Sequence, residues 1–297
     1  MGRLGLFVFG LLVLGVFVSP IVLVASASSV VGVDPGFRVV VGEVGEVGVF
    51  VFRVAYFGSG VGFFVLSTNS SSSSVYPSSF SLLSGQVATV YVTDVRSAPG
   101  IYDNVLTVRE LGSGEVVNVT ARYAVASECI RGSSTGGVIV LVADSINVSV
   151  EINTTGITCA KLCVLPENPL PEYVPADSMS LNRYFDVYIG RPDRVVWPIT
   201  VKMNYTEQEI LDDNLDEISL KMNYWNDTGL TTFADTGVHT NIRQVYAYPE
   251  ENETRGSIIM AIAQVNIVPI PEPPVTGMIL AIATISLAGL LYWKRYM

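Results

Sequence analysis

The chain has 297 residues, of which 49% are hydrophobic and 15% charged, and its formal net charge is -10. Soluble domains are usually about 25% charged, so this composition predicts that part of the apolar content lies in membrane-type segments. The basic residues Arg3, Lys294 and Arg295 lie in the two apolar ends, which leaves the intervening chain more acidic still. Such a surface repels phosphate backbones and anionic headgroups, and this excludes nucleic acid as an expected partner.

The N-terminal end has the pattern of an export signal. Arg3 precedes an apolar run from Leu4 to Val24, and the small residues Ala25-Ser26-Ala27 follow. We predict a signal peptide over residues 1–27, cleaved between Ala27 and Ser28. The alternative is an uncleaved anchor, because a run of about 20 apolar residues is long enough to span a bilayer.

Residues 36–126 alternate between apolar and polar positions with a period of two. Phe50, Phe52, Val54 and Tyr56 would share one face of a strand, as would Ala88, Val90 and Val92. Further strands are expected at Phe37–Val41, Phe63–Thr68, Tyr102–Val108 and Val116–Tyr123. Six or seven short strands in about 90 residues predict an antiparallel immunoglobulin-like β-sandwich. The stretches VYPSSFSLLSGQVATVYVT and PGIYDNVLTV resemble the immunoglobulin-like domains related to the sperm-protein and PapD sandwiches.

A change of composition follows near Ser127, where we place the domain boundary. Residues 127–183 combine a glycine-rich break, a probable strand pair around Val138–Ile152, and four prolines at 166, 169, 171 and 175. This composition is typical of a stiffened linker.

Residues 184–268 predict a second β-rich domain. Trp197–Tyr205 has strand character, and Thr206 with Glu209 forms a capping box that should start one short helix ending near Asp213. Alternation resumes at Ile218–Trp225. This part of the chain resembles the archaeal surface module called the PGF-pre-PGF domain. The resemblance lies in the order of the stretch WPITVKMNYTEQEILDDNLDEISLKMNYWND and of the segments that follow it. That family has no assigned enzymatic activity, so the resemblance implies a cell-surface location and an architecture, and no particular chemistry.

The C-terminal end, residues 269–297, contains an uncharged apolar stretch from Val275 to Trp293, followed by Lys294-Arg295. This arrangement predicts a transmembrane helix with the ectodomain outside. Pro271-Glu272-Pro273 before the helix resembles the PEP-CTERM or PEF-CTERM sorting tails, which implies a sorting protease as a partner.

Seven sequons of the form Asn-x-Ser/Thr predict glycosylation of the exported part. Their asparagines are Asn69, Asn118, Asn147, Asn153, Asn204, Asn226 and Asn252.

The chain has three cysteines, Cys129, Cys159 and Cys163, which is an odd number for the oxidising compartment that export implies. We expect one structural disulfide and one thiol, through either a Cys159–Cys163 loop or a longer-range bond from Cys129. A metal is not expected, because one histidine and no CxxC pair provide no zinc set.

No catalytic constellation is recognisable. His239 is the single histidine, and the acidic run 212–217 lacks the glycine and the distal glutamate of a calcium loop. We therefore expect neither cofactor nor enzyme activity.

The expected function is that of a glycosylated, non-enzymatic cell-surface protein with a structural, adhesive or protein-interaction role. Its expected partners are the membrane, other envelope proteins and glycans. The alternative is an extracellular carbohydrate- or ligand-binding module, for which Trp225 could supply an aromatic platform unless it is buried in a core. An extracellular hydrolase with a carboxylate pair would need a residue such as Asp235 to be essential.

Overall fold

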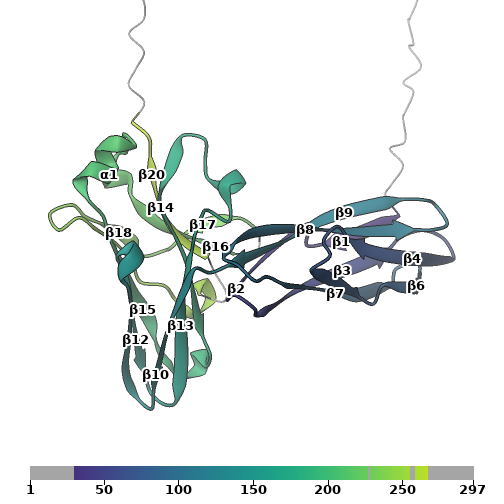
Figure 1. The fold of residues 1–297 in the computed structure, drawn as a ribbon, viewed down its shortest axis with the longest axis horizontal. Helices are drawn as coiled ribbons and strands as arrows, with labels where there is room; N and C mark the ends of the chain where they lie inside the picture. The colour runs from purple at the N-terminus through teal and green to yellow at the C-terminus, as the bar shows by residue number, and fades with distance from the viewer. Residues whose placement is uncertain (1–29, 227, 255–257, 267–297) are drawn as a thin grey trace, which may run out of the picture.

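The computed structural model describes residues 30–226, 228–254 and 258–266, which form two β-sandwiches joined side by side (Figure 1). The predicted signal peptide, the sorting motif and the predicted C-terminal transmembrane helix lie outside these residues. Within the described residues, no helix is long and apolar enough to cross a bilayer. The described residues are mostly β with one short α-helix, as the sequence predicts for this part of the chain.

The N-terminal sandwich is immunoglobulin-like and has two facing sheets. The first, called here the β1 sheet, has the order β1 (Val31–Asp34), β3 (Val47–Tyr56), β7 (Val87–Val95) and β5 (Ser73–Tyr76). The second, the β2 sheet, has the order β2 (Phe37–Gly42), β9 (Val116–Val125), β8 (Gly100–Glu110), β4 (Val61–Thr68) and β6 (Ser79–Leu83). All described pairings in both sheets are antiparallel except that of β2 with β9.

The period-two prediction for this sandwich is confirmed at its centre. Phe50, Phe52 and Val54 are fully buried and Tyr56 is 6% exposed, while the intervening side chains of β3 point to solvent or are only partly covered. Phe50 meets Tyr123 of the opposite sheet edge to face, with ring centroids 6.2 Å apart. The strands β1, β5 and β6 are additions to the predicted set.

The second sandwich begins at β10 and uses the stretch interpreted above as a linker. Its β10 sheet has the order β10 (Glu128–Ser134), β13 (Thr158–Leu165), β14 (Ser178–Ile189), β20 (Ile258–Gln264), β16 (Lys221–Trp225) and β17 (Leu230–Thr232). Its β11 sheet has the order β11 (Gly137–Ala143), β12 (Val148–Thr154), β15 (Val195–Asn204), β19 (Gln244–Ala247) and β18 (Thr236–His239). Residues 127–183 are thus part of this sandwich and not a tether. The expected strand pair is β11 with β12, and the four prolines lie in the connection between β13 and β14.

The α-helix of the described residues, α1 (Glu207–Asp212), starts where the sequence predicts. Thr206 Oγ1 accepts a hydrogen bond from the Glu209 backbone N–H, and the Glu209 carboxylate accepts one from the Thr206 backbone, so the capping box is complete. The remaining helical turns are the 3-10 segments η1 (Asp144–Ile146), η2 (Pro171–Tyr173), η3 (Pro192–Arg194), η4 (Glu217–Ser219) and η5 (Glu251–Glu253).

The central strand β20 of the β10 sheet is buried on both faces, and this fixes how the sandwiches sit together. Along β20, Ile259 and Ala261 face the core of the second sandwich, whereas Ile258, Met260 and Ile262 join an apolar cluster shared with the N-terminal sandwich. Val39, Ala124 and Ala126 of the N-terminal sandwich belong to the same shared cluster. We call this cluster the junction.

Candidate functional site

The junction is held by an aromatic cluster that joins both sandwiches. Phe37 on β2 meets Trp225 on β16 edge to face, with ring centroids 5.6 Å apart, and Tyr173 lies 4.5 Å from the same tryptophan. Trp225 is 3% exposed, and its Nε1 donates to no group in the described part of the chain. The tryptophan therefore packs between domains and offers no exposed platform for a sugar, which removes the role suggested for it above.

Ion pairs close one side of the junction. The Arg122 guanidinium lies 5.1 Å from the centre of the Phe37 ring and pairs with Asp103 of its own sandwich at 2.7 Å. It also pairs with Glu172 of the second sandwich at 2.6 Å and donates to the Pro169 carbonyl. One buried arginine stem thus holds the proline-rich connection between β13 and β14 against β9.

On the other side, the turn between β2 and β3 reaches the second sandwich. Tyr123 supports this turn: its hydroxyl donates to the Glu46 carbonyl at 2.9 Å, and its ring lies against Gly42 and Gly48, where no Cβ would fit. The Glu43 carboxylate accepts a hydrogen bond from the Arg131 guanidinium. Lys161 Nζ lies 3.3 Å from Glu43 Oε1 and 3.6 Å from Glu46 Oε2. Burial opposes ionisation of Glu43, but the hydrogen bonds from Arg131 and Lys161 outweigh it and lower its pKa.

A polar cavity of about 760 Å³ lies between this turn and the second sandwich. It is lined by Val41, Glu43, Val44, Gly45, Glu46, Arg131, Gly132, Cys159, Ala160, Lys161, Asp186 and Tyr188. Asp186 is 6% exposed, and its Oδ1 has no hydrogen-bond partner among the described residues. Burial raises the pKa of Asp186 to about 7, against the opposing charge of Lys161. No sequence signal points to this aspartate, because it lies within a strand that gives no motif.

The disulfide lies beside this cavity. Cys129 on β10 and Cys163 on β13 are register partners and are bonded, while Cys159 is an exposed free thiol. Of the two pairings left open by the sequence, the structure has the one from Cys129. A carboxylate oxygen of Glu43 lies within 4.8 Å of both sulfurs, so these three residues form a group of potential metal ligands. Both sulfurs are consumed by the disulfide, so this grouping supplies no thiolate.

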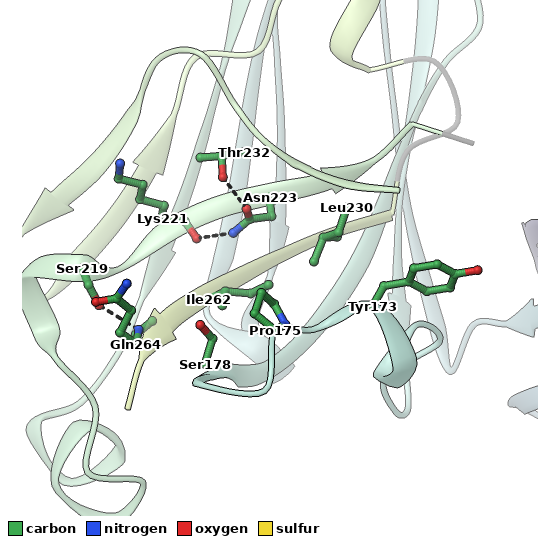
Figure 2. A pocket seen from close by; sticks show the side chains of 11 residues that line it. Tyr173, Pro175, Ser178, Ser219, Lys221, Asn223, Leu230, Thr232, Ile262 and Gln264 are labelled. Atoms are coloured by element: carbon green, nitrogen blue, oxygen red, sulfur yellow. Dashed lines mark hydrogen bonds between the residues drawn. The ribbon is translucent and has the colours of Figure 1, made fainter. Parts of the chain in front are cut away.

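A second, shallower pocket of about 240 Å³ lies on the β10 sheet next to Tyr173 (Figure 2). Lys221, Asn223 and Thr232 line one wall, and Ser178, Ile262 and Gln264 lie across from them. The Asn223 amide donates to the Lys221 carbonyl at 3.0 Å and accepts from Thr232 at 2.7 Å. Ligand pockets usually measure about 300–1,000 Å³, so this one has room for little more than a single polar ring.

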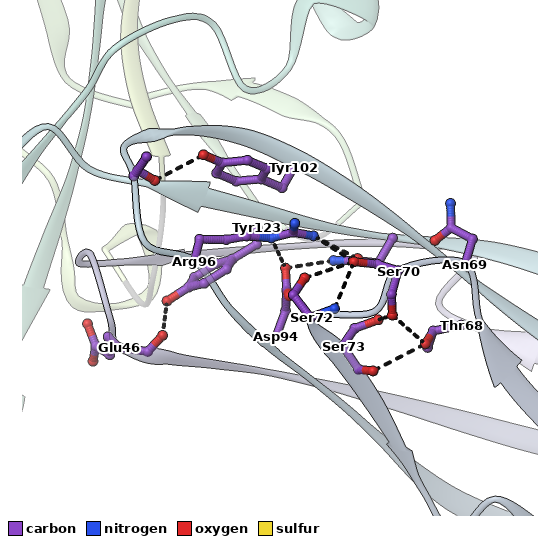
Figure 3. A network of polar contacts seen from close by, with 12 residues as sticks. Glu46, Thr68, Asn69, Ser70, Ser72, Ser73, Asp94, Arg96, Tyr102 and Tyr123 are labelled. Carbon is purple, nitrogen blue, oxygen red and sulfur yellow. Dashed lines mark hydrogen bonds and ion pairs between the residues drawn. The ribbon is translucent and has the colours of Figure 1, made fainter.

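The serine run of the N-terminal sandwich is ordered by a buried carboxylate (Figure 3). Asp94 is completely buried and accepts from Ser72 at 2.8 Å, Arg96 at 2.8 Å and Asn104 at 2.9 Å. In the serine run Ser70–Ser74, Ser73 and Ser74 belong to the edge strand β5, and Ser70 to Ser72 precede it. This network stabilises the sandwich, because its polar groups form hydrogen bonds with one another.

The residues considered for catalysis lie apart. His239 is exposed at the end of β18, stacked on Tyr246 with ring centroids 4.5 Å apart. Asp235 is exposed as well. In the acidic run, the Asp216 carboxylate accepts a hydrogen bond from the Ile218 backbone N–H, and the Asn214 side-chain amide donates one to the Asn266 carbonyl. These residues therefore shape a chain reversal.

All seven sequon asparagines have exposed side chains. Asn118, Asn153 and Asn204 lie on strands β9, β12 and β15, Asn252 lies in the 3-10 segment η5, and the others lie between these elements. The exposure leaves each amide accessible to a modifying enzyme, while glycosylation itself stays a prediction.

Comparison with known proteins gives likeness in fold only. No family model matches the chain, and no curated protein sequence matches it. Among solved structures, a PapD-like domain of human CEP192 is 13% identical over 33% of this chain and 87% of its own, with a TM-score of 0.30. A protein of unknown function from Porphyromonas gingivalis W83 is 12% identical over 80% of this chain and 84% of its own, with a TM-score of 0.31. The periplasmic chaperone SfaE is 10% identical over 59% of this chain and 93% of its own, with a TM-score of 0.28. No function is transferred from any of them.

Proposed function

We propose that this chain is a non-enzymatic cell-surface protein that presents two rigidly joined β-sandwiches for protein interaction. The junction carries the proposal. Relative motion of domains is the default unless their interface is large and apolar, and here an apolar, aromatic cluster is flanked by ion pairs on both sides. A fixed pair of sandwiches suits a spacer or a binding platform.

Export, anchoring and glycosylation belong to the same proposal. The signal-peptide pattern of residues 1–27, the apolar stretch Val275–Trp293 and the seven sequons support them, as does the disulfide, since such bonds persist in oxidising compartments. The resemblances to the PGF-pre-PGF module and to PEP/PEF-CTERM sorting tails add an archaeal-type envelope location and a sorting protease as partner.

Mass spectrometry of native cell envelopes tests this proposal. We expect a mature N-terminus at Ser28 and sugar on several of the seven asparagines. Recovery of the peptide ending in Met297 would indicate a permanent anchor, and its loss would indicate processing by a sorting protease. A protein that starts at Met1, carries no sugar and is absent from the envelope fraction would refute the proposal.

The second candidate function is that of a carbohydrate- or ligand-binding module, favoured by the pocket between Tyr173 and Lys221. Glycan-array binding by the purified chain tests it. Binding that is lost in Lys221→Ala but kept in Lys202→Ala, a lysine of the β11 sheet, would support this candidate. Absence of binding to all glycans would leave the interaction platform as the only proposal.

A further inference from the structure

The cavity between the β2–β3 turn and the β10 sheet contains a carboxylate without a partner. Asp186 and Tyr188 are two residues apart on β14, and the side chain between them, Val187, belongs to the core of the second sandwich. Asp186 and Tyr188 therefore point the other way, toward the N-terminal sandwich. Asp186 is 6% exposed and lines the cavity, and its Oδ1 accepts no hydrogen bond within the described residues. Buried polar atoms are normally paired, so this atom indicates a partner from outside the chain.

The other charged groups of the cavity are already paired. Glu43 pairs with both Arg131 and Lys161. Lys161 also lies 3.6 Å from Glu46. An anionic ligand would have to compete with these glutamates for the two cations, and an ammonium group beside Asp186 would meet the charge of Lys161. The charges of the cavity therefore favour a neutral ligand.

The chemistry of Asp186 narrows the choice further. Burial raises its pKa to about 7, so near neutral pH the carboxyl is present in both protonation states. The ionised form only accepts hydrogen bonds, whereas the protonated form also donates one. A hydroxyl group both donates and accepts, so it can pair with either form. An ammonium group can only donate, and an ionised carboxylate or phosphate group can only accept. Asp186 is thus best matched by a hydroxyl.

The walls of the cavity add an aromatic and apolar surface. Tyr188 is 51% exposed and Val44 is 49% exposed, and both line the cavity together with Val41. Ligand sites usually measure about 300–1,000 Å³ and combine such a lining with a few polar groups, and this cavity measures about 760 Å³. A sugar has the matching composition, with C–H groups on the faces of its ring and hydroxyls at the edge. Asp186 and Tyr188 lie about 7 Å apart along the strand, a separation that a saccharide of one or two rings spans.

We infer that this cavity binds a neutral saccharide, with one hydroxyl hydrogen-bonded to Asp186 and a ring face packed against Tyr188. Both sandwiches contribute to the site, because turn residues 43–46 lie opposite strands β10, β13 and β14. The site is separate from the pocket between Tyr173 and Lys221. It depends on neither export, anchoring nor glycosylation of the chain.

Saturation-transfer NMR and calorimetry of the purified full-length chain test the inference. The probes are the methyl glycosides and disaccharides of glucose, galactose, mannose and N-acetylglucosamine, with the amino and uronic-acid forms of each sugar as charged controls. We expect at least one neutral saccharide to bind, and its charged forms to bind about tenfold more weakly or not at all. Asp186→Leu, which keeps the size of the side chain and removes its polar atoms, should weaken binding by about tenfold or more. Tyr188→Ala should do the same, whereas Tyr91→Ala, at an exposed position of the N-terminal sandwich, should leave the affinity unchanged. Circular dichroism shows whether each variant remains folded.

Alkylation of Cys159 by iodoacetamide locates the bound sugar. Cys159 is the exposed free thiol and lines the same cavity. Bound sugar should therefore slow its alkylation in proportion to the occupied fraction of the sites, and Asp186→Leu should abolish this protection.

Three outcomes would overturn the inference. Absence of binding for every neutral saccharide would mean that water satisfies Asp186. Binding that leaves the alkylation of Cys159 unchanged would exclude this cavity as the site. Binding that is lost in Lys221→Ala and kept in Asp186→Leu would assign the sugar to the pocket beside Tyr173. None of these outcomes bears on export or anchoring, which the mass spectrometry of native envelopes tests separately.

Discussion

Asp186 gives the sharpest prediction for the pH dependence of stability. Its carboxyl titrates at an ordinary value of 3.8 when unfolded, and burial raises its pKa to about 7 in the folded chain. Between these values the folded state holds a proton that the unfolded state has lost. The contribution of Asp186 is therefore most favourable below about pH 4, declines as the pH rises to about 7, and stays constant above that.

The size of the effect follows from the separation of the two pKa values. About three pH units at 1.36 kcal/mol each set an upper limit of about 4 kcal/mol. Asp186→Asn removes the ionisable group while keeping its shape, so we expect a more stable protein at pH 8 and a flatter pH profile. Asp144→Asn, at an exposed position of the same sandwich, is the matched control and should keep the profile of the unaltered chain.

Urea unfolding at half-unit intervals from pH 4 to pH 8 measures these profiles. Parallel curves for the unaltered chain and Asp186→Asn would refute the reasoning, because they would mean that the buried carboxyl does not change its protonation on unfolding. A stabilisation at pH 8 that vanishes at pH 4 is the expected pattern.

Three further substitutions probe the parts that hold the sandwiches. Trp225→Ala should cost about 3–5 kcal/mol on urea unfolding and increase the spread of inter-domain distances in X-ray scattering; an unchanged scattering curve would mean that the junction does not depend on this ring. Cys129→Ala opens a disulfide with a sequence separation of 34, for which loop entropy predicts a loss of about 4 kcal/mol; a midpoint equal to that of the unaltered chain would contradict this. Asp94→Ala leaves the buried Asn104 amide without its acceptor and should cost about 2–3 kcal/mol, measured against Asp144→Ala at an exposed site.

Local patterns predicted the parts of the fold that local physics determines. The alternation of Phe50, Phe52 and Val54 predicted β3, because one face of that strand is buried and the other is exposed. Thr206 and Glu209 predicted the start of α1, because a capping box satisfies its own donors.

The parts not predicted depend on contacts between distant segments. β20 is buried on both faces, so Ile258–Ala263 shows no alternation that would mark a strand. Trp225 is buried by Phe37 from the other sandwich, and no local pattern predicts that partner. The pairing of Cys129 with Cys163 follows from the register of β10 and β13, which the cysteine spacing alone leaves open.

The position of β20 has a mechanical consequence for a chain tethered beyond residue 266. This strand lies inside its sheet, bonded to β14 on one side and to β16 on the other. A pull along the strand from its C-terminal end loads the two rows of hydrogen bonds in shear, so they must break together and not one after another. The tension would pass next into the junction, because the side chains of Ile258, Met260 and Ile262 are packed there. A load applied between the N-terminal sandwich and residue 266 would thus pass through apolar packing and sheared strands, and not through a flexible connection.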